Sequence, residues 1–423
     1  MARLWTLLFL LAPALASGHA LDPLQEHPLL RQAQALLEAA RKGVEAQAAP
    51  VALNLQGNYT RLGYECTPSS LCQNLPGTGG SLTLSLVLTP FPFGEAADGL
   101  ARAQIAYRRA ELGYRKALTA LQAQAVAAHG RHRQALLGVE AAAKGLELAE
   151  KALEAARKRQ ANAKELREAE LAVLEAKNRL EEARRGLELA KRAAAGLVDL
   201  EKPLPNIPPP RGSTPLALEE ARLSVAEAGI AYESALRALL PQAQASYLLY
   251  LSGNDTLALT LSSRSLQPTL SYTRQDPARQ PTAVPGGGSY RTQEELRLSL
   301  SLTLSPGLLE ALEAATFQKQ GAEEALRATE VQAGLQEATL RHALQGAEAA
   351  LALARKRLAA QEQAYEEVRQ RLALGLESPL ALLQAELSLV QARLGLAQAE
   401  SEYRNRLMDL YQFYGELLPE VAP

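Results

Sequence analysis

Aromatic side chains are scarce in this 423-residue chain: they make up 4% of it, although apolar residues reach 47%. Most of the apolar residues are Ala and Leu, and they are mixed with Glu, Arg and Lys. This composition is typical of long helices rather than of a globular enzyme core. The formal net charge is −1, so the chain lacks the positive field of a nucleic-acid-binding protein. We therefore expect no nucleic acid among its partners.

The motifs of the common enzyme classes are also missing. The sequence contains no phosphate loop, nucleophile elbow, zinc pattern or dinucleotide fingerprint. His129 and His132 lie three residues apart on a predicted helix, but no third ligand is near them in the sequence. A solvated or lumen-facing pair is therefore favoured over a metal site. We expect a protein that is not an enzyme and that binds no cofactor or metal.

Beyond residue 20 the sequence lacks an apolar run long enough for a transmembrane helix, so that a membrane span must either be a β-barrel or be absent. The first residues differ. Arg3 precedes an apolar run over residues 4–15 that is too short to cross a bilayer, and small residues follow it. This pattern predicts a signal peptide over residues 1–20 and hence an exported protein.

Cysteine is nearly absent. Cys66 and Cys72 are the only two, and five residues separate them. In an exported chain we predict that they form a disulfide that closes a small loop, rather than remaining free thiols. No histidine lies near them in the sequence, which argues against a metal site.

The main organising feature is an internal repeat. Asp22-Pro23 and Thr214-Pro215 each combine a polar cap with a proline at the first helical position, and each predicted helix stops at a later proline. A β region and more than 100 residues of helical pattern follow in both halves. The first repeat, 21–201, is predicted to contain a helix at 22–48, strands at 50–64 and 80–90, and a helical hairpin at 95–198. After a Pro-rich linker at 202–213, the second repeat, 214–418, is predicted to contain a helix at 214–240, a β region at 241–305 and a hairpin at 307–415.

Both hairpins carry a heptad pattern. In the first, Leu166, Val173, Leu180 and Leu187 recur every seven residues, and an alanine follows each by three. The pattern predicts a coiled-coil seam in which small residues allow close approach of the helices. In the second hairpin, Gly375, Ser378 and Pro379 predict a helix stop, a cap and a helix start. The first hairpin has Asn162 as a cap at the equivalent place but no glycine.

The strands alternate in character. In the first repeat Leu82, Leu84, Leu86 and Leu88 alternate with Ser81, Thr83, Ser85 and Val87, and in the second the even positions 296–304 are all Leu. This period is typical of a barrel strand that faces lipid on one side and water on the other, although a soluble half-buried sheet is the alternative. Two weaker strands are predicted at 51–62 and 266–274. Four spanning strands cannot close a barrel, whereas three copies of the chain would supply twelve.

The second β region is about 25 residues longer than the first, so it is predicted to hold an inserted strand pair or a long loop. The predicted strand ends are rich in aromatic residues, where membrane-interface aromatics belong. These residues are Tyr59, Tyr64, Phe91, Phe93, Tyr272 and Tyr290.

The order helix, two strands and long helical hairpin, repeated around a Pro-rich linker, resembles the TolC-like outer-membrane factor family. The best local match is residues 375–386, from the glycine turn into the Leu-x-Ala helix, and the resemblance covers essentially the whole mature chain. It implies a mainly α protein with a membrane β-barrel portion and two structural repeats. It also implies a homotrimer with a twelve-stranded β-barrel continuous with a twelve-helix coiled-coil α-barrel in the periplasm.

The resemblance also implies a function and a set of partners. The chain would be the outer-membrane exit duct of a tripartite system, surrounded by outer membrane lipid and fed by an inner-membrane pump and a periplasmic adaptor (membrane fusion) protein. Small-molecule efflux and type I protein secretion stay open as alternatives, and so does a periplasm-spanning coiled-coil adaptor or tether. The residues implied to face the adaptor are Arg159, Gln160, Ala161, Asn162, Gly375, Leu376, Glu377 and Ser378. Members of the family often carry an acidic gate residue where this chain has Gln384, so Gln384 and Glu386 are the gate candidates.

Overall fold

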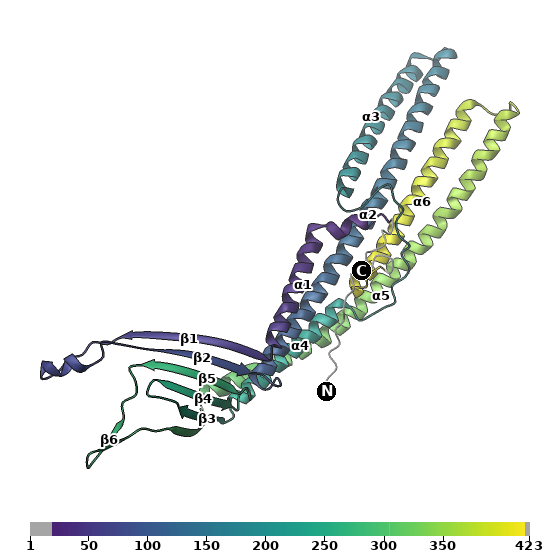
Figure 1. The fold of residues 1–423 in the computed structure, drawn as a ribbon. Helices are drawn as coiled ribbons and strands as arrows, with labels where there is room; N and C mark the ends of the chain where they lie inside the picture. Colours follow the sequence, from purple (N-terminus) through teal and green to yellow (C-terminus); the bar gives the residue numbers. More distant parts are fainter. Residues whose placement is uncertain (1–18, 304, 419–423) are drawn as a thin grey trace. The chain divides into compact units, whose positions relative to one another are not determined.

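The computed structural model describes residues 19–303 and 305–418. Most of the predicted signal peptide, and Leu304, lie outside these residues. The chain divides into two units. The helical unit comprises residues up to Leu36, Glu111–Glu220 and residues from Ala328 onward, and the sheet unit comprises Leu37–Ala110 and Ala221–Arg327. Each unit is described on its own below, and Figure 1 labels the α-helices and most of the strands.

The sheet unit is built on an antiparallel sheet whose strand order is β1-β2-β5-β4-β3-β8. Six strands therefore form the sheet in the described chain, whereas the sequence predicts four spanning segments. The additional strands come from the segment after Pro241, which folds as the inserted strand pair rather than as a long loop. The strands are β1 (Val51–Arg61), β2 (Thr78–Leu88), β3 (Gln242–Tyr250), β4 (Asp255–Ser262), β5 (Thr269–Asp276) and β8 (Glu294–Ser301), with β6 (Thr282–Val284) and β7 (Gly288–Tyr290) as a separate small pair.

The two faces of the sheet differ in chemistry, as the alternating pattern predicts. On one face Leu84 of β2 lies opposite Leu55 of β1 and Tyr272 of β5. All three side chains are at least 37% exposed, so this apolar face is uncovered in the single chain. On the other face the hydroxyls of Thr83 and Thr273 lie 3.0 Å apart and share a hydrogen bond. One surface of the sheet is thus apolar and the other polar.

The connection between β1 and β2 contains a short 3-10 helix, η2 (Ser69–Asn74), which ends at a cap residue, Leu75. A disulfide joins Cys66, which precedes this helix, to Cys72 within it, with their Cα atoms 5.7 Å apart. The bond closes a loop of this connection and leaves the paired residues of both strands outside it.

Six α-helices account for most of the described residues. They are α1 (Pro28–Gln47), α2 (Glu95–Lys158), α3 (Ala163–Ala194), α4 (Leu216–Ala238), α5 (Pro306–Ala373) and α6 (Pro379–Tyr414). The first α-helix begins later than the cap signal at Asp22-Pro23 indicates. That signal opens a 3-10 helix, η1 (Asp22–Glu26), and His27 then takes an extended conformation. A proline disfavours the helical conformation in the residue before it, so the α-helix starts afresh at Pro28.

The core of the helical unit lies where α2 meets the second half of α6. Leu121 and Val126 of α2 and Leu407 and Met408 of α6 are at most 3% exposed and belong to one cluster. Among the described helices, α6 is also the one that could cross a membrane by length and composition alone. Three residues near its C-terminal end, Leu407, Met408 and Tyr411, belong to the same buried cluster as residues of α2.

The Pro-rich linker is fastened to this core. Tyr411, 2% exposed, donates a hydrogen bond from its hydroxyl to the backbone oxygen of Pro208, at 3.0 Å. The Glu416 carboxylate accepts three hydrogen bonds of 2.7–2.9 Å from the backbone N–H groups of residues 211–213. These hydrogen bonds lower the pKa of Glu416 even though its partial burial acts in the opposite direction. The linker therefore has a fixed path over the C-terminal end of α6.

Helices α2 and α6 approach each other closely at Gly130. A Cβ atom at this position would lie 2.2 Å from the Ser401 hydroxyl oxygen and 3.0 Å from the Ser401 Cβ. Ser401 is itself buried, at 6% exposure, so it has little room to move away. Glycine at position 130 therefore sets the distance between the two repeats at this point.

We predict that Gly130→Ala destabilises the protein by about 1–3 kcal/mol, because overpacking forces the two helices apart. Gly138→Ala on the same helix is the matched control, since a Cβ there meets nothing within 4 Å. The control should be stabilising by about 0.5–1 kcal/mol through helix propensity alone. Chemical denaturation of the purified protein compares the two, and equal stability of both variants would show that the close approach does not constrain the fold.

Candidate functional site

The two helical hairpins each end in a tight turn (Figure 1). In the first, α2 ends at Lys158 and Gln160 adopts a positive φ of 54°. The Asn162 side chain then caps α3 by accepting hydrogen bonds from the backbone N–H groups of Lys164 and Glu165, at 3.1 and 2.9 Å. The Asn162 amide also donates to the Glu165 carboxylate at 3.0 Å, which completes a reciprocal cap.

The second turn uses different residues for the same purpose. Gly375 has a φ of 72°, a left-handed conformation that glycine adopts at no steric cost. Ser378 caps α6 by accepting a hydrogen bond from the backbone N–H of Ala381 at 3.2 Å, and Pro379 occupies the first turn of the helix. Between them Leu376 is 72% exposed, and Leu374 before the glycine is 73% exposed. The turn thus presents apolar side chains to solvent.

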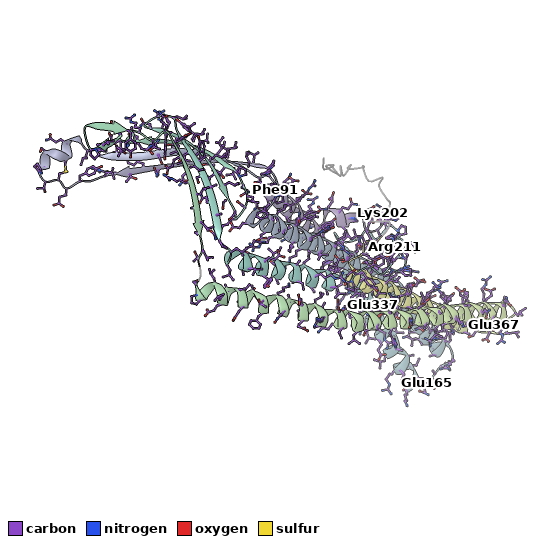
Figure 2. The ribbon with its side chains drawn as sticks, turned by 90° about the horizontal axis from the view of Figure 1, so that it is seen from below. Phe91, Glu165, Lys202, Arg211, Glu337 and Glu367 are labelled. Carbon is purple, nitrogen blue, oxygen red and sulfur yellow. A yellow bond between two sulfur atoms is a disulfide. The ribbon has the colours of Figure 1, made fainter. Side chains whose placement is uncertain are left out.

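Ion pairs surround both turns. In the first hairpin Arg157 lies 3.1 Å from Glu170, and Arg159 lies 3.3 Å from Glu165. Figure 2 shows Glu165 at the end of its hairpin. In the second, Arg371 and Glu377 are 3.7 Å apart. The side chains of these residues are mostly well exposed, so each pair contributes about 0.2–1 kcal/mol at most and leaves charged groups available at the surface.

The two gate candidates differ in their surroundings. Gln384 is exposed. Glu386, two residues on, turns toward α2, where its carboxylate lies 2.8 Å from the ammonium of Lys144. Glu386 and then Glu147 raise the pKa of Lys144. Because the pKa of this lysine is raised, the contribution of the pair is complete at neutral pH and is lost only as the pH rises through the pKa of Lys144.

This ion pair connects the two repeats, since α2 belongs to the first and α6 to the second. A second connection lies further along the same antiparallel pair of helices, where Arg133 and Glu400 are 2.6 Å apart. Sequence reasoning missed the role of Lys144, because its partner is 242 residues away and nothing local distinguishes it from other helical lysines.

The histidine pair lies on α2 near the Arg133 connection. His129 is more buried than His132, and burial, followed by the nearby Arg404 charge, lowers its pKa. Burial and then Lys191 lower the pKa of His132. Both rings are therefore neutral at pH 7. Within the described residues no group of three or more metal-ligating side chains occurs.

The second repeat has a match among known protein families. Residues 214–416 match the family model described as outer membrane efflux protein. No curated protein sequence matches the chain significantly.

Three solved structures show the extent of the fold similarity. The open-state outer membrane channel MtrE of Neisseria gonorrhoeae is 19% identical, with a TM-score of 0.59 over 93% of this chain and 87% of that one. The outer membrane protein VceC of Vibrio cholerae is 18% identical, with a TM-score of 0.58 over 92% and 94%. The outer membrane channel CmeC of Campylobacter jejuni is 15% identical, with a TM-score of 0.59 over 95% and 87%. These similarities confirm the predicted TolC-like fold.

Proposed function

We propose that this chain, whose second repeat matches the outer membrane efflux protein family, is the non-enzymatic outer-membrane exit duct of a tripartite export system. In this role it passively conducts substrates that an inner-membrane pump and a periplasmic adaptor deliver. The helical hairpins would lie in the periplasm and the sheet in the outer membrane.

The observation that carries this proposal is the sheet with one apolar and one hydroxyl-bearing face. A strand that faces lipid on one side and a wet lumen on the other needs this alternation. A soluble sheet would cover its apolar face, yet Leu298 and Leu300 of β8 are each 75% exposed and Leu55 of β1 is 69% exposed. Acyl chains of the membrane are the partner that suits such a surface.

The same sheet requires more than one copy of the chain. In the described residues β1 and β8 lie at the two edges of the sheet, each with one unpaired side. Unpaired backbone groups are not tolerated in hydrocarbon, and about eight strands are needed to enclose even a packed interior. A homotrimer, in which β8 of one copy pairs with β1 of the next, satisfies every edge.

The turns at residues 159–162 and 375–378 are proposed to contact the adaptor. Their exposed Leu374 and Leu376 and the flanking arginines and glutamates offer apolar contact area with charged surroundings. Small-molecule efflux and protein secretion place the same demands on this end of the duct. The nature of the pump, rather than the duct, therefore decides which cargo is carried.

Within this proposal, the Lys144–Glu386 ion pair joins the two hairpins and opposes their separation. Each partner is about one-third exposed or less. The ion pair therefore contributes on the order of 1 kcal/mol. This is enough to shift the equilibrium between two arrangements of the hairpins without making either one exclusive.

The first prediction tests the duct itself. The mature protein should require detergent for solubility, form trimers and produce discrete conductance steps in a planar bilayer. A channel of this kind needs no adaptor to conduct, because the lumen is part of the trimer. A protein that dissolves in buffer as a single elongated chain would instead support the adaptor or tether alternative.

The second prediction concerns the Lys144–Glu386 ion pair between the hairpins. Lys144→Met should increase the open fraction in the bilayer about fivefold, the factor that corresponds to 1 kcal/mol. Lys151→Met is the matched control, because Lys151 pairs with Glu154 of its own helix, at 3.2 Å, and not across to α6 in the part of the chain that the structure describes. Equal gating of the two variants would remove the proposed role of Lys144.

The third prediction concerns the second turn. Replacing residues 375–378 with four alanines should abolish pump-dependent export, because it removes both the left-handed glycine and the Ser378 cap. The trimer should persist, since the sheet is unchanged. Alanines at Glu362, Gln363 and Glu367, exposed positions of α5, serve as the control. Figure 2 labels Glu367. Unchanged export after replacement of the turn would contradict its docking role.

A further inference from the structure

The inserted hairpin β3–β4 lies in the middle of the sheet. It pairs with β5 through β4 and with β8 through β3, along six and eight residue pairs. The strands β5 and β8 are therefore not neighbours, although β5 is the last sheet strand before β8 along the chain. Without the hairpin they would face each other directly. The insertion thus adds to the width of the sheet and not to its loops.

The hairpin carries the same two faces as the rest of the sheet. Leu259 of β4 lies opposite Tyr247 of β3 on one side and Leu270 of β5 on the other. Leu259 and Tyr247 are 49% and 42% exposed. One unbroken apolar row therefore crosses all six strands. From β1 to β8 it runs Leu53, Leu86, Leu270, Leu259, Tyr247 and Leu296.

The adjacent row on the opposite face is polar where it crosses the hairpin. Thr260 of β4 lies opposite Ser246 of β3 and Thr269 of β5, and Ser246 lies opposite Arg297 of β8. A hairpin placed inside an aqueous lumen would have water on both faces and no reason for this division. Burying a leucine side chain is worth about 1.5–3 kcal/mol, so the apolar row is stable only against another apolar phase.

The long connection between β5 and β8 is adapted to the insertion. It crosses the outer turn of the hairpin and is held there by Arg279. The backbone N–H of Arg279 donates to the Gly253 oxygen at 2.8 Å, and its guanidinium lies 3.6 Å from the centroid of the Tyr250 ring. The same guanidinium donates to the Thr256 hydroxyl at 3.1 Å. These contacts span both strands of the hairpin and hold its outer end in the plane of the sheet.

We propose that β3 and β4 are lipid-facing strands of the barrel wall, so that three copies of this chain enclose a barrel of eighteen strands rather than twelve. The inference rests on the proposed function, because it assumes a trimeric barrel. The occupant of the Leu257, Leu259 and Leu261 face is the acyl region of the outer membrane, as it is for the neighbouring leucines of β2. The additional interaction surface is thus a lipid contact, and the segment from Gln242 to Ser262 is part of the membrane span.

The proposal implies a larger diameter for the barrel through which substrates would leave. Barrel diameter grows roughly linearly with strand number, so eighteen strands give a barrel about half as wide again as twelve. Barrels of about this size leave an open aqueous channel without a plug. The membrane portion would then not limit the size of the cargo.

The test places a fluorophore on single cysteines in the full-length trimer in proteoliposomes. The two native cysteines are bonded to each other, so an introduced cysteine is the free thiol. The variants are Leu259→Cys and Thr260→Cys on β4, with Leu84→Cys and Thr83→Cys on β2 as benchmarks. Brominated lipids quench a probe in the bilayer, and iodide quenches a probe in water.

We expect the probe at 259 to behave like the one at 84, with quenching by lipid, and the probe at 260 to behave like the one at 83, with quenching by iodide. Iodide quenching at 259 together with lipid quenching at 84 would place the hairpin off the wall and overturn the inference alone. Loss of lipid quenching at 84 would overturn the proposed function as well.

A deletion variant provides a second measurement. Removing residues 242–267 joins Pro241 to Pro268 and lets β5 pair directly with β8, because the deletion takes out one outward and one inward strand. The trimer of this variant should have a barrel about one-third narrower by electron cryomicroscopy. An unchanged diameter would contradict the inference. If the variant does not assemble, the quenching contrast at 259 and 260 decides.

Discussion

The rest of the structure depends on the need of a strand in hydrocarbon to pair both of its edges. Water is not available there to satisfy unpaired N–H and C=O groups, so a sheet in a membrane has to close on itself. The six-stranded sheet of one chain leaves an edge at β1 and another at β8 in the described residues. The missing strands have to come from other copies, and the number of copies then fixes how many helical hairpins stand together. Assembly is in this sense a consequence of backbone hydrogen bonding, and no special interface residue is needed to explain it.

The internal repeat shows which features of the chain are constrained when several copies assemble to close the sheet. The caps Asn162 and Ser378 are separated by the same interval as Pro90 and Pro306, so each helical arm keeps its length from the end of the sheet to the turn. The residue that makes the turn is less constrained, because Gln160 adopts the left-handed conformation that Gly375 adopts in the other repeat. The inserted hairpin occurs in the second repeat alone. Arm length is thus held constant while turn chemistry and sheet width differ between the repeats.

Features with a local physical cause could be predicted from the sequence. The cap at Ser378, the glycine turn at Gly375 and the alternation of Leu84 with its hydroxyl-bearing neighbours depend on residues next to each other, and the structure shows all three. For the hairpin β3–β4 the sequence allows either a strand pair or a long loop, because Ala243 and Ala245 give the outward strand only a weakly apolar face. The Lys144–Glu386 pair could not be predicted, since it depends on the register of two helices that are far apart in the sequence.

The two units are suited to different tasks because separating the strands of the sheet requires much more free energy than separating the helices. Widening the sheet means separating strands such as β1 and β2, which are joined along eleven residue pairs. Each backbone hydrogen bond contributes about 1 kcal/mol in water, and an unpaired group in hydrocarbon costs several times more. Strand number therefore sets the width of the sheet in whole steps. Separating α2 from α6 at Lys144 costs only on the order of 1 kcal/mol. Under the proposed function, a docking partner supplies that much from a few contacts, so control of passage belongs to the helical unit, while the sheet unit provides a passage of constant width.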